Sequence, residues 1–339
     1  QSAAKILLKI TPASGQAVEH AMKTISVVSP CYNEEENVAA CYATVKEIFE
    51  RELPGYRLEH IFADNASTDR TAEILKEIAA KDPGVKVIVN ARNFGVLRSA
   101  FNALSYARGD AVLVLLPVDL QDPPEHIPEF VRLWESGYDV VAGARANREE
   151  GAIMQAGRWV FYRIVNWLSD IKLSPNIGEF QLIDKKVLDA VLAHNDHFPY
   201  IRGIIASCGF RRVVVDYTWK ARKRGVSKHN ILALIDQGLN GIFSFTRAPM
   251  RFCTLAGIVI SALCILFALF SVLAYFVAGH LAPRGVTTLI VAFFFISGIQ
   301  LLFIGFLGEY VTSIHAQVRG GPLVVERERI NIEPADARS

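Results

Sequence analysis

Between residues 24 and 143 the chain alternates short apolar runs with amphipathic stretches. The apolar, β-prone runs lie at 24–29, 60–63, 85–89, 111–116 and 139–143. After each of the first four, apolar residues recur at helical spacing, as Val38, Tyr42 and Val45 do after the first. Strands and helices that alternate with short connections predict an α/β fold with a doubly wound, mainly parallel sheet.

Two later stretches contain no charged residue. They lie at 252–279 and 286–308 and are separated by only six residues. About 20 apolar residues are enough for a helix to span a bilayer. The pattern therefore predicts a transmembrane hairpin whose two flanks lie on the same side of the membrane.

Positive charge gathers on those flanks, although the net charge of the whole chain is only +2. Residues 211–228 hold seven Lys or Arg against one Asp, and Arg319, Arg327 and Arg329 follow the second stretch. The positive-inside rule places the N-terminal region and both termini in the cytoplasm.

These patterns divide the chain into five parts. The segment 230–251 has Ile231, Leu234 and Ile235 at helical spacing, which indicates a helix in the membrane interface or an ordinary surface helix. The predicted parts are an extension at 1–22, an α/β domain at 23–229, the interface region at 230–251, the hairpin at 252–310 and a cytoplasmic tail at 311–339.

Polar residues collect where the predicted strands end. The first four strands lead into PCYNE, DNASTD, ARNFG and DLQD. In a doubly wound sheet such ends meet in one crevice, where ligands bind. Oxygen ligands from Asp119, Gln121 and Asp122 would suit Mg or Mn and a phosphate-bearing substrate. The alternative is a polar turn before a helix that starts at prolines.

The whole series of motifs resembles glycosyltransferase family 2. PCYNEEEN, FADNASTDRT, ARNFG and DLQDPPEHIPEF carry the resemblance, which covers residues 24–230 and implies a GT-A fold. With the C-terminal hairpin, the chain is similar to the polyprenyl-phosphate glycosyltransferases, the group of dolichyl-phosphate mannose synthase and undecaprenyl-phosphate sugar transferases.

That resemblance implies an activity and its partners. A sugar would move, with inversion, from a UDP- or GDP-sugar to a polyprenyl phosphate, with undecaprenyl phosphate as the expected acceptor. The enzyme would be a multi-pass protein of the bacterial inner membrane, would serve cell-envelope glycan synthesis and would bind no nucleic acid.

The resemblance also assigns residues. Those expected to hold the nucleotide are Pro30, Tyr32, Glu34, Asp64 and Asn65. Asp119 and Gln121 would bind the Mg or Mn ion that bridges the diphosphate. The expected phosphate and acceptor ligands are Arg145, Arg158, Arg222 and Lys228, the last two within ARKRGVSK. The expected catalytic residues are Asp119, Glu179, Arg222 and Lys228.

Some positions depart from the family pattern and indicate a divergent subgroup. Pro117 stands where an Asp is usual, two residues before Asp119, and Asn65 and Trp219 replace a common Asp and Arg. Glu179 lies at about the position of the usual acidic base. A strong base is dispensable, because a phosphate monoester has a second pKa of about 6 and is already a nucleophile at neutral pH. The site must mainly bring two anions together.

Three other functions fit parts of the sequence. QAGRW at 155–159 matches the QxxRW motif of processive polysaccharide synthases, but two predicted spans are too few for a polymer channel. A non-catalytic nucleotide-sugar-binding membrane protein and an anchored transferase with a soluble acceptor are the others. Small residues in the hairpin, such as Gly257, Gly298 and Gly305, would also permit packing between protomers in a homo-oligomer.

Overall fold

The computed structural model describes residues 22–147, 176–219 except 195, 197 and 198, helical residues at 255–260, 262, 263, 266 and 270, and residues 286–333. Three of the predicted site residues, Arg158, Arg222 and Lys228, lie outside the described residues. So do the predicted interface region, the QAGRW motif and nearly all of the N-terminal extension.

The described strands form one sheet in the order β7-β5-β6-β4-β1-β2-β3-β8. Their bounds are β1 Lys23–Cys31, β2 Tyr56–Asp64, β3 Val85–Asn90, β4 Ala111–Leu113, β5 Val140–Asn147, β6 Ile177–Asp184, β7 Arg212–Thr218 and β8 Glu326–Ile330. Strands β1 to β4 run parallel, whereas β6 and β8 are antiparallel to their neighbours. The predicted α/β sheet is confirmed, and it is mixed.

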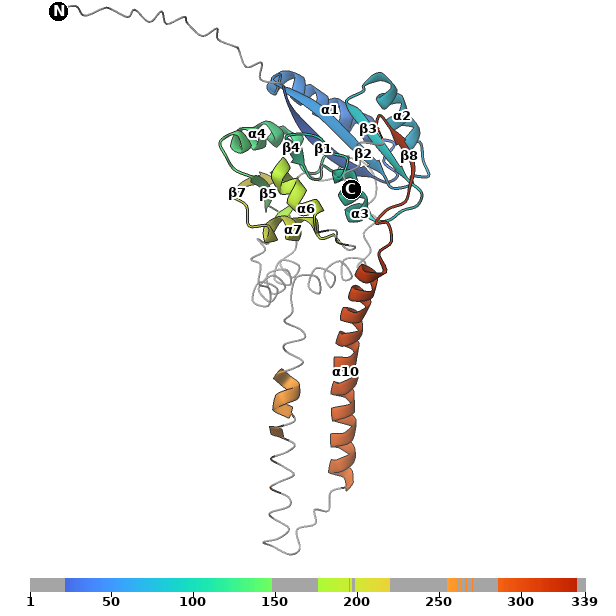
Figure 1. The fold of residues 1–339 in the computed structure, drawn as a ribbon, viewed down its shortest axis with the longest axis vertical. Coiled ribbons are helices and arrows are strands. Elements are labelled where there is room, and N and C mark those ends of the chain that lie inside the picture. Colours follow the sequence, from blue (N-terminus) through green and yellow to red (C-terminus); the bar gives the residue numbers. More distant parts are fainter. Residues whose placement is uncertain are drawn as a thin grey trace, which may run out of the picture.

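Helices cover both faces of this sheet (Figure 1). Their bounds are α1 Val38–Glu52, α2 Thr71–Lys81, α3 Val96–Leu104, α4 Ile127–Glu135 after the short 3-10 helix η1 Pro124–His126, α6 Lys185–Leu192 and α7 Ile201–Ser207. Neighbouring strand residues point to opposite faces. Phe62 therefore packs in the layer under α1, α2 and α4, whereas Ile61 packs under α3, α6 and α7.

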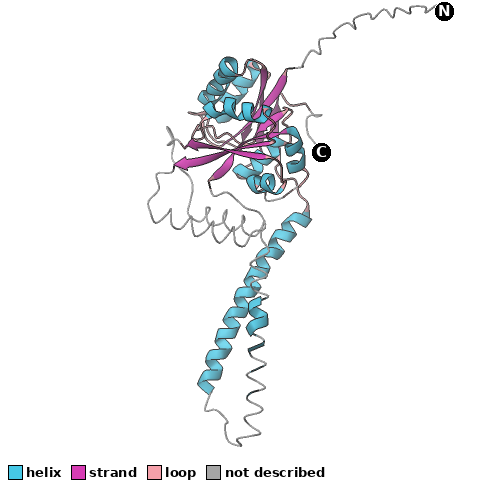
Figure 2. Ribbon diagram, turned by 90° about the vertical axis from the view of Figure 1, so that its left-hand side faces the viewer, coloured by secondary structure: helices cyan, strands magenta, loops and turns pink. Residues whose placement is uncertain are grey.

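A long helix, α10 (Val286–Arg319), extends away from the domain (Figure 2). Its segment Phe295–Arg319 is long and apolar enough to cross a membrane, and none of that window is buried. Side chains such as Phe295 and Leu301 are exposed. The helix matches the second predicted span and continues past its expected end at residue 308. Most of the first predicted span lies outside the described residues, so the hairpin stays a prediction.

After α10 the chain returns to the sheet. Residues 320–325 lead from the helix to β8, which pairs antiparallel with the edge strand β3. The predicted tail therefore contains the end of α10 and a strand of the same sheet as the N-terminal region (Figure 1).

Candidate active site

The polar loops after β1, β2 and β3 are tied together at the carboxyl edge of the sheet. The backbone N–H of Asn33 donates to Ser67 Oγ at 2.9 Å, and the N–H of Thr68 donates back to Asn33 Oδ1 at 2.8 Å. Asn65 Nδ2 donates to Asn93 Oδ1 in the third loop at 2.9 Å. The predicted convergence of these strand ends is therefore found in the structure.

Asp64 lies at the end of β2 and is fully buried. Ser67 donates to its carboxylate from both the backbone N–H, at 3.2 Å, and the hydroxyl. Burial raises the pKa of Asp64, and the hydrogen bonds from Ser67 oppose that rise. The Asp64 carboxylate therefore lies beneath the loop after β2 and holds it through Ser67. The predicted contact of Asp64 with the nucleotide stays a prediction.

Asn65 is buried beside Asp64 and uses both ends of its amide. Its Oδ1 accepts from Phe94 N at 2.9 Å and from Asn90 Nδ2 at 3.1 Å, while its Nδ2 serves Asn93. A carboxylate could accept but could not donate. This explains why an amide stands where the family often has an acid, and it gives Asn65 a part in shaping the third loop.

Three of the loops contain a non-glycine residue with positive φ. These are Asn33 at 53°, Ala66 at 63° and Leu120 at 55°, one each after β1, β2 and β4. Such a conformation costs about 1 kcal/mol or more per residue and is concentrated at functional sites. Residues with positive φ therefore lie at the carboxyl edge of the sheet, where the sequence motifs predicted the site.

The loop after β4 holds the predicted metal ligands. Backbone pairing continues past the end of β4, since Leu116 N donates to Val28 O at 2.8 Å. The turn that follows brings Asp119 Oδ1 within 3.2 Å of Gln121 N, and both side chains are partly exposed. No cluster of three or more His, Cys, Asp or Glu suited to a metal occurs among the described residues. A carboxylate and an amide oxygen still fit Mg, which commonly takes few protein ligands and completes its shell with phosphate and water.

Asp122 turns away from solvent and forms a buried network behind that loop. Arg145 of β5 contacts both carboxylate oxygens of Asp122, at 3.2 and 3.0 Å, and Tyr217 of β7 donates to Oδ1 at 2.5 Å. Burial opposes the charge of Arg145, but the Asp122 carboxylate outweighs it and raises the pKa of the guanidinium. Arg145, predicted to hold phosphate, is therefore bound from one side by protein groups, and its guanidinium lies 5.5 Å from the Trp219 ring.

Glu179 lies on β6, next to the metal loop. Strand β6 runs antiparallel to β4, with Leu113 paired with Leu182, so Glu179, near the start of β6, lies toward the carboxyl end of β4. The Glu179 carboxylate is 3.5 Å from Arg202 Nε of α7. The structure thus brings Glu179 to the same edge as Asp119, with a cation beside it.

The remaining predicted nucleotide ligands lie at the end of β1 and in the loop after it. Pro30 pairs with Ala63 inside the sheet, and the Tyr32 side chain is exposed. Glu34 Oε2 accepts from Asn37 Nδ2 at 2.6 Å at the start of α1. Tyr32 and Glu34 therefore lie in the loop after β1, whereas Pro30 is buried in the strand before that loop.

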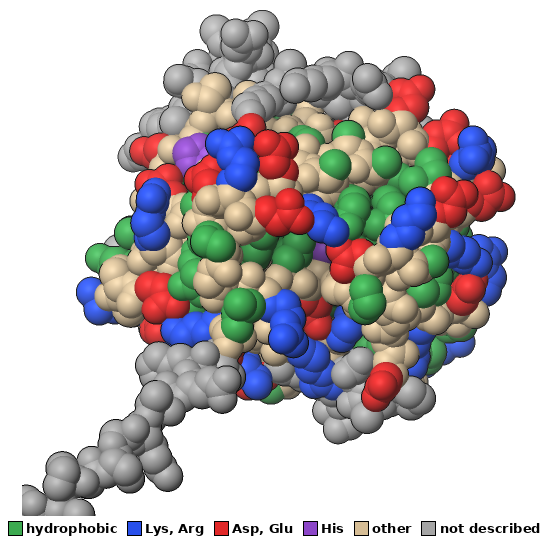
Figure 3. All heavy atoms as spheres, turned by 90° about the horizontal axis from the view of Figure 1, so that it is seen from above, with side chains coloured by type: hydrophobic (Ala, Val, Ile, Leu, Met, Phe, Trp, Pro, Cys, Tyr) green, Lys and Arg blue, Asp and Glu red, His purple; other side chains and the backbone are tan. Residues whose placement is uncertain are grey.

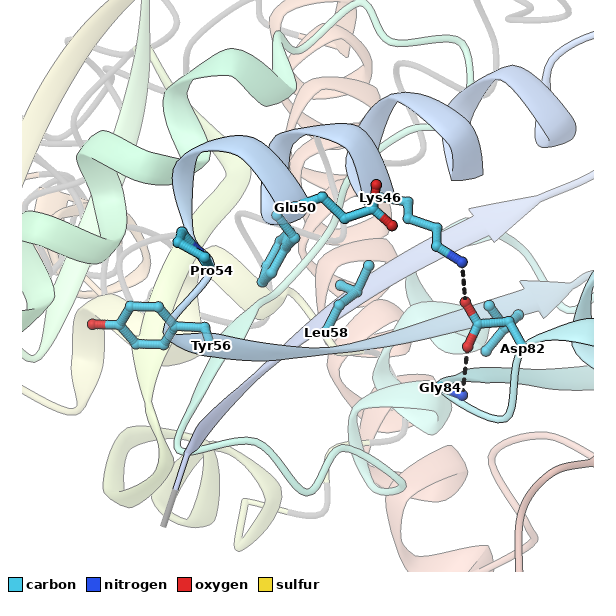
Figure 4. A pocket seen from close by; sticks show the side chains of 9 residues that line it. Lys46, Glu50, Pro54, Tyr56, Leu58, Asp82 and Gly84 are labelled. Carbon is cyan, nitrogen blue, oxygen red and sulfur yellow. Dashed lines mark hydrogen bonds and ion pairs between the residues drawn. The ribbon is translucent and has the colours of Figure 1, made fainter. Parts of the chain in front are cut away.

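A separate hollow of about 370 Å³ lies at the opposite edge of the sheet (Figure 4). It is lined by Tyr56 and Val85, which begin β2 and β3, and by Lys46 and Asp82, whose charged groups are 2.9 Å apart. This hollow does not contain the predicted site residues. On the surface, the view from the end opposite α10 shows acidic and basic side chains intermixed (Figure 3).

Comparison with known proteins agrees with the motifs. The model of the family described as Glycosyl transferase family 2 matches residues 26–192. An uncharacterized glycosyltransferase of Bacillus subtilis (strain 168) is 33% identical over 91% of this chain and 94% of its own length. The SfII prophage-derived bactoprenol glucosyl transferase of Shigella flexneri is 34% identical over 88% of this chain and 96% of its own length.

Among solved structures, the mannosyltransferase PcManGT from Pyrobaculum calidifontis in complex with GDP-Man and Mn²⁺ is 17% identical, covers 88% of this chain and 87% of its own, and has a TM-score of 0.43. The family assignment depends on the sequence relatives, whose similarity extends over about nine tenths of both chains. With the family model and these relatives in agreement, the chain belongs to glycosyltransferase family 2 and is a glycosyltransferase.

Proposed function

We propose that this glycosyltransferase moves a sugar from a nucleotide sugar to a polyprenyl phosphate at a membrane surface. The observation that carries the proposal is the position of α10. Residues 320–325 join this exposed apolar helix to Glu326, which pairs with Asn90 at the carboxyl end of β3. The long apolar helix is thus linked to the sheet at the edge that holds the candidate site, where a lipid headgroup would arrive.

The relatives support the same acceptor. Several proteins that are 34% identical over most of the chain are named bactoprenol glucosyl transferases. The donor would be a UDP- or GDP-sugar, held by the loops after β1 and β2 through Pro30, Tyr32, Glu34 and Asp64. Asn65 would shape the third loop against them.

A divalent cation, Mg or Mn, would be held by Asp119 and Gln121 and would screen the charge of the donor diphosphate. Arg145 and Asp122 would keep the turn that carries these ligands in place. Arg158, Arg222 and Lys228 would provide cations for the lipid phosphate. Glu179 would lie beside the reacting groups as a catalytic residue.

The reaction would be a single in-line displacement. An oxygen of the lipid phosphate forms a bond to the anomeric carbon while the bond from that carbon to the diphosphate breaks, which inverts the configuration. The nucleoside diphosphate leaves with the electron pair. The protein contributes by holding two anions in line and by stabilising the leaving charge.

The membrane arrangement is part of the proposal. The helix before the 280–285 loop and α10 would form a hairpin in a bacterial inner membrane, with the catalytic domain and both termini in the cytoplasm. Its small residues would allow a homo-oligomer.

Purified full-length protein, undecaprenyl phosphate and a panel of UDP-, GDP- and dTDP-sugars with Mg or Mn provide the test. We expect labelled sugar in the lipid fraction with one donor, loss of transfer with excess chelator, and at least a hundredfold lower kcat/KM for Asp119→Ala. Lys46→Ala, at the opposite edge, serves as the control and should retain activity.

Two results would contradict the proposal. Absence of sugar on the lipid with every donor would exclude a polyprenyl-phosphate acceptor. Polymer made from the nucleotide sugar without any lipid phosphate would indicate the processive alternative.

A further inference from the structure

The segment that follows α10 in the chain forms part of the edge that holds the candidate donor site. Glu326, the first residue of β8, pairs with Asn90, the last residue of β3. One residue earlier, the carbonyl of Val325 accepts from Ala91 N at 2.8 Å. Asn90 in turn donates to Asn65. The end of the chain therefore enters the sheet directly beside the loops after β2 and β3.

The pairing of β8 with β3 contains a bulge at Arg327. Val89 pairs with Glu328 and Asn90 pairs with Glu326, so the register shifts at this step and Arg327 is the extra residue. A bulge changes the direction in which a side chain points and often occurs beside a functional site. The Arg327 side chain is exposed at this position.

The neighbours of Arg327 on β8 are ion-paired on opposite faces of the sheet. Glu328 Oε2 is 2.6 Å from Lys76 Nζ of α2. Arg329 pairs with Glu326, which also accepts from Tyr106 Oη near the end of α3, at 3.1 Å. These contacts fasten β8 to both helical layers.

Asp64 lies level with the bulge. In the β2–β3 register Asp64 pairs with Val89, so only β3 separates Asp64 from Arg327. Two strand spacings amount to about 10 Å, a distance that a long side chain can largely cross. Besides burial, which raises the pKa of Asp64, and the Ser67 hydrogen bonds, which lower it, the positive charge of Arg327 also lowers that pKa.

We propose that Arg327 is a donor-binding residue, which contacts the nucleoside end of the nucleotide sugar at the edge of the sheet where β2 ends in Asp64. The strand order supports the nucleoside end over the diphosphate. The metal loop follows β4, on the far side of β1, whereas Arg327 lies on the outer side of β3. A planar guanidinium suits this place, since it can donate to base carbonyl oxygens and stack on a ring.

This inference rests on the proposed function only in requiring a nucleotide donor. It means that the segment after α10 provides one side of the donor site. The sugar acceptor, whether lipid or not, plays no part in it.

The test measures nucleotide binding to full-length protein in nanodiscs, by calorimetry with UDP, UMP, GDP and GMP. For the base that the wild type prefers, Arg327→Ala should weaken the diphosphate and the monophosphate alike, each about tenfold. Arg327→Lys should lie between, because a lysine keeps the charge but not the planar group.

Arg329→Ala is the matched control, since it removes the same charge from the same strand but on the α3 side. It should lower the thermal midpoint of the protein and leave nucleotide affinity within twofold of wild type. We expect the thermal midpoint of Arg327→Ala to stay close to that of the wild type, which would show that β8 is still docked.

Three results would overturn the inference. They are wild-type affinity in Arg327→Ala, an equal loss of affinity in Arg329→Ala, and a loss for the diphosphate alone. Protein that binds nucleotide through Arg327 yet transfers no sugar to polyprenyl phosphate would contradict the proposed function and leave the inference standing. Normal transfer of sugar to polyprenyl phosphate by Arg327→Ala, with an unchanged donor KM, would contradict the inference and leave the proposed function standing.

Discussion

At the scale of single residues, a buried charged network restrains the loop that carries the proposed metal ligands. Asp122 is 1% exposed and follows Asp119 by three residues. Its carboxylate is held at once by Arg145 and Tyr217, which come from two other strands. The turn between Asp119 and Asp122 is therefore fixed at its inner end.

Removing the Asp122 carboxylate should lower the free energy of unfolding more than removing the Tyr217 hydroxyl. Asp122→Ala leaves the largely buried Arg145 without its counter-charge, which costs about 3–5 kcal/mol. Tyr217→Phe removes the hydrogen bond donated to Asp122 and the one accepted from Arg145, and it should lower the free energy of unfolding by about 1–2 kcal/mol. Urea unfolding followed by tryptophan fluorescence measures both. Equal losses in the two variants would show that the network is not organised around Asp122.

A buried histidine gives stability a dependence on pH. His60 of β2 is fully buried, its Nε2 lies 3.0 Å from Ser29 Oγ and its ring stacks on Phe62. Burial lowers the pKa of His60 to about 3. An unfolded histidine titrates at about 6.5, so below that pH the unfolded chain binds a proton that the folded protein does not.

The contribution of His60 to the free energy of unfolding should be complete above pH 6.5. It should be lost as the pH falls from 6.5 toward 3, by up to about 1.4 kcal/mol per pH unit. His60→Gln keeps a partner for Ser29 and does not titrate. The thermal midpoint of wild type should therefore fall more steeply than that of the variant between pH 6.5 and 4. Parallel curves would contradict the assignment.

The sequence predicted where the site residues lie but not what they touch. Asp64, Asn65 and Asp119 follow apolar runs, and a parallel sheet must bring such ends together. The partners are distant in the chain: Tyr217 reaches Asp122 across 95 positions. Nothing local marked Arg145 as a partner of Asp122, because that contact depends on strand order, which hydrophobic periodicity does not specify.

At the scale of elements, Asn331 fastens the end of β8. Its Nδ2 donates to the carbonyl oxygens of Ala79 at 2.8 Å and Val85 at 2.9 Å, at the end of α2 and the start of β3. Its φ of 56° lies in the left-handed region, which asparagine tolerates better than most residues. One side chain thus joins the last strand to two other elements.

Two substitutions separate these effects. Asn331→Gly loses the hydrogen bonds, but glycine adopts the positive φ without strain. Asn331→Ala loses the hydrogen bonds and also strains the backbone, so it should be less stable than the glycine variant by about 1 kcal/mol. Hydrogen exchange of the β8 amides should accelerate in both variants and most in the alanine. Unchanged exchange in both would mean that the pairing with β3 alone holds the strand.

The elements that periodicity missed have a physical reason for their patterns. The sequence ERERI of β8 is mostly charged, as is common for edge strands, where charge discourages pairing with other chains. By contrast, β1 is buried throughout from Ile25 and β2 from Glu59, because both of their faces are covered, and each includes a short apolar segment (residues 27–28 and 61–63). A central strand of such a sheet can be recognised from its sequence, but an edge strand of this kind cannot.

At the scale of the whole molecule, the sheet is completed by a strand that follows the long apolar helix α10. The N-terminal segment 23–229 would include seven of the strands, and the eighth arrives after α10. The partly buried Ile330 of β8 packs against the core layer beneath α1 and α2. A chain cut before the apolar stretches would therefore lack part of this layer and expose the edge of β3.

Two shortened chains make this consequence measurable. One ends at residue 229, and the other joins residue 229 to residues 320–333 through a flexible linker of 25 Gly and Ser residues. Such a linker has an average end-to-end distance of about 25–30 Å, which leaves the last strand free to find β3. We expect the joined chain to be monomeric with the higher thermal midpoint, and the cut chain to aggregate through its open edge.

Ile330→Asp in the joined chain is the matched control, because it keeps the linker and the strand but introduces a charge into the core contact. It should behave like the cut chain in both thermal unfolding and gel filtration. If the cut chain were as stable and as soluble as the joined one, β8 would be dispensable for the fold. In that case any effect of Arg327 on nucleotide binding could not be attributed to β8 holding the sheet together, and it would have to arise at the pocket itself.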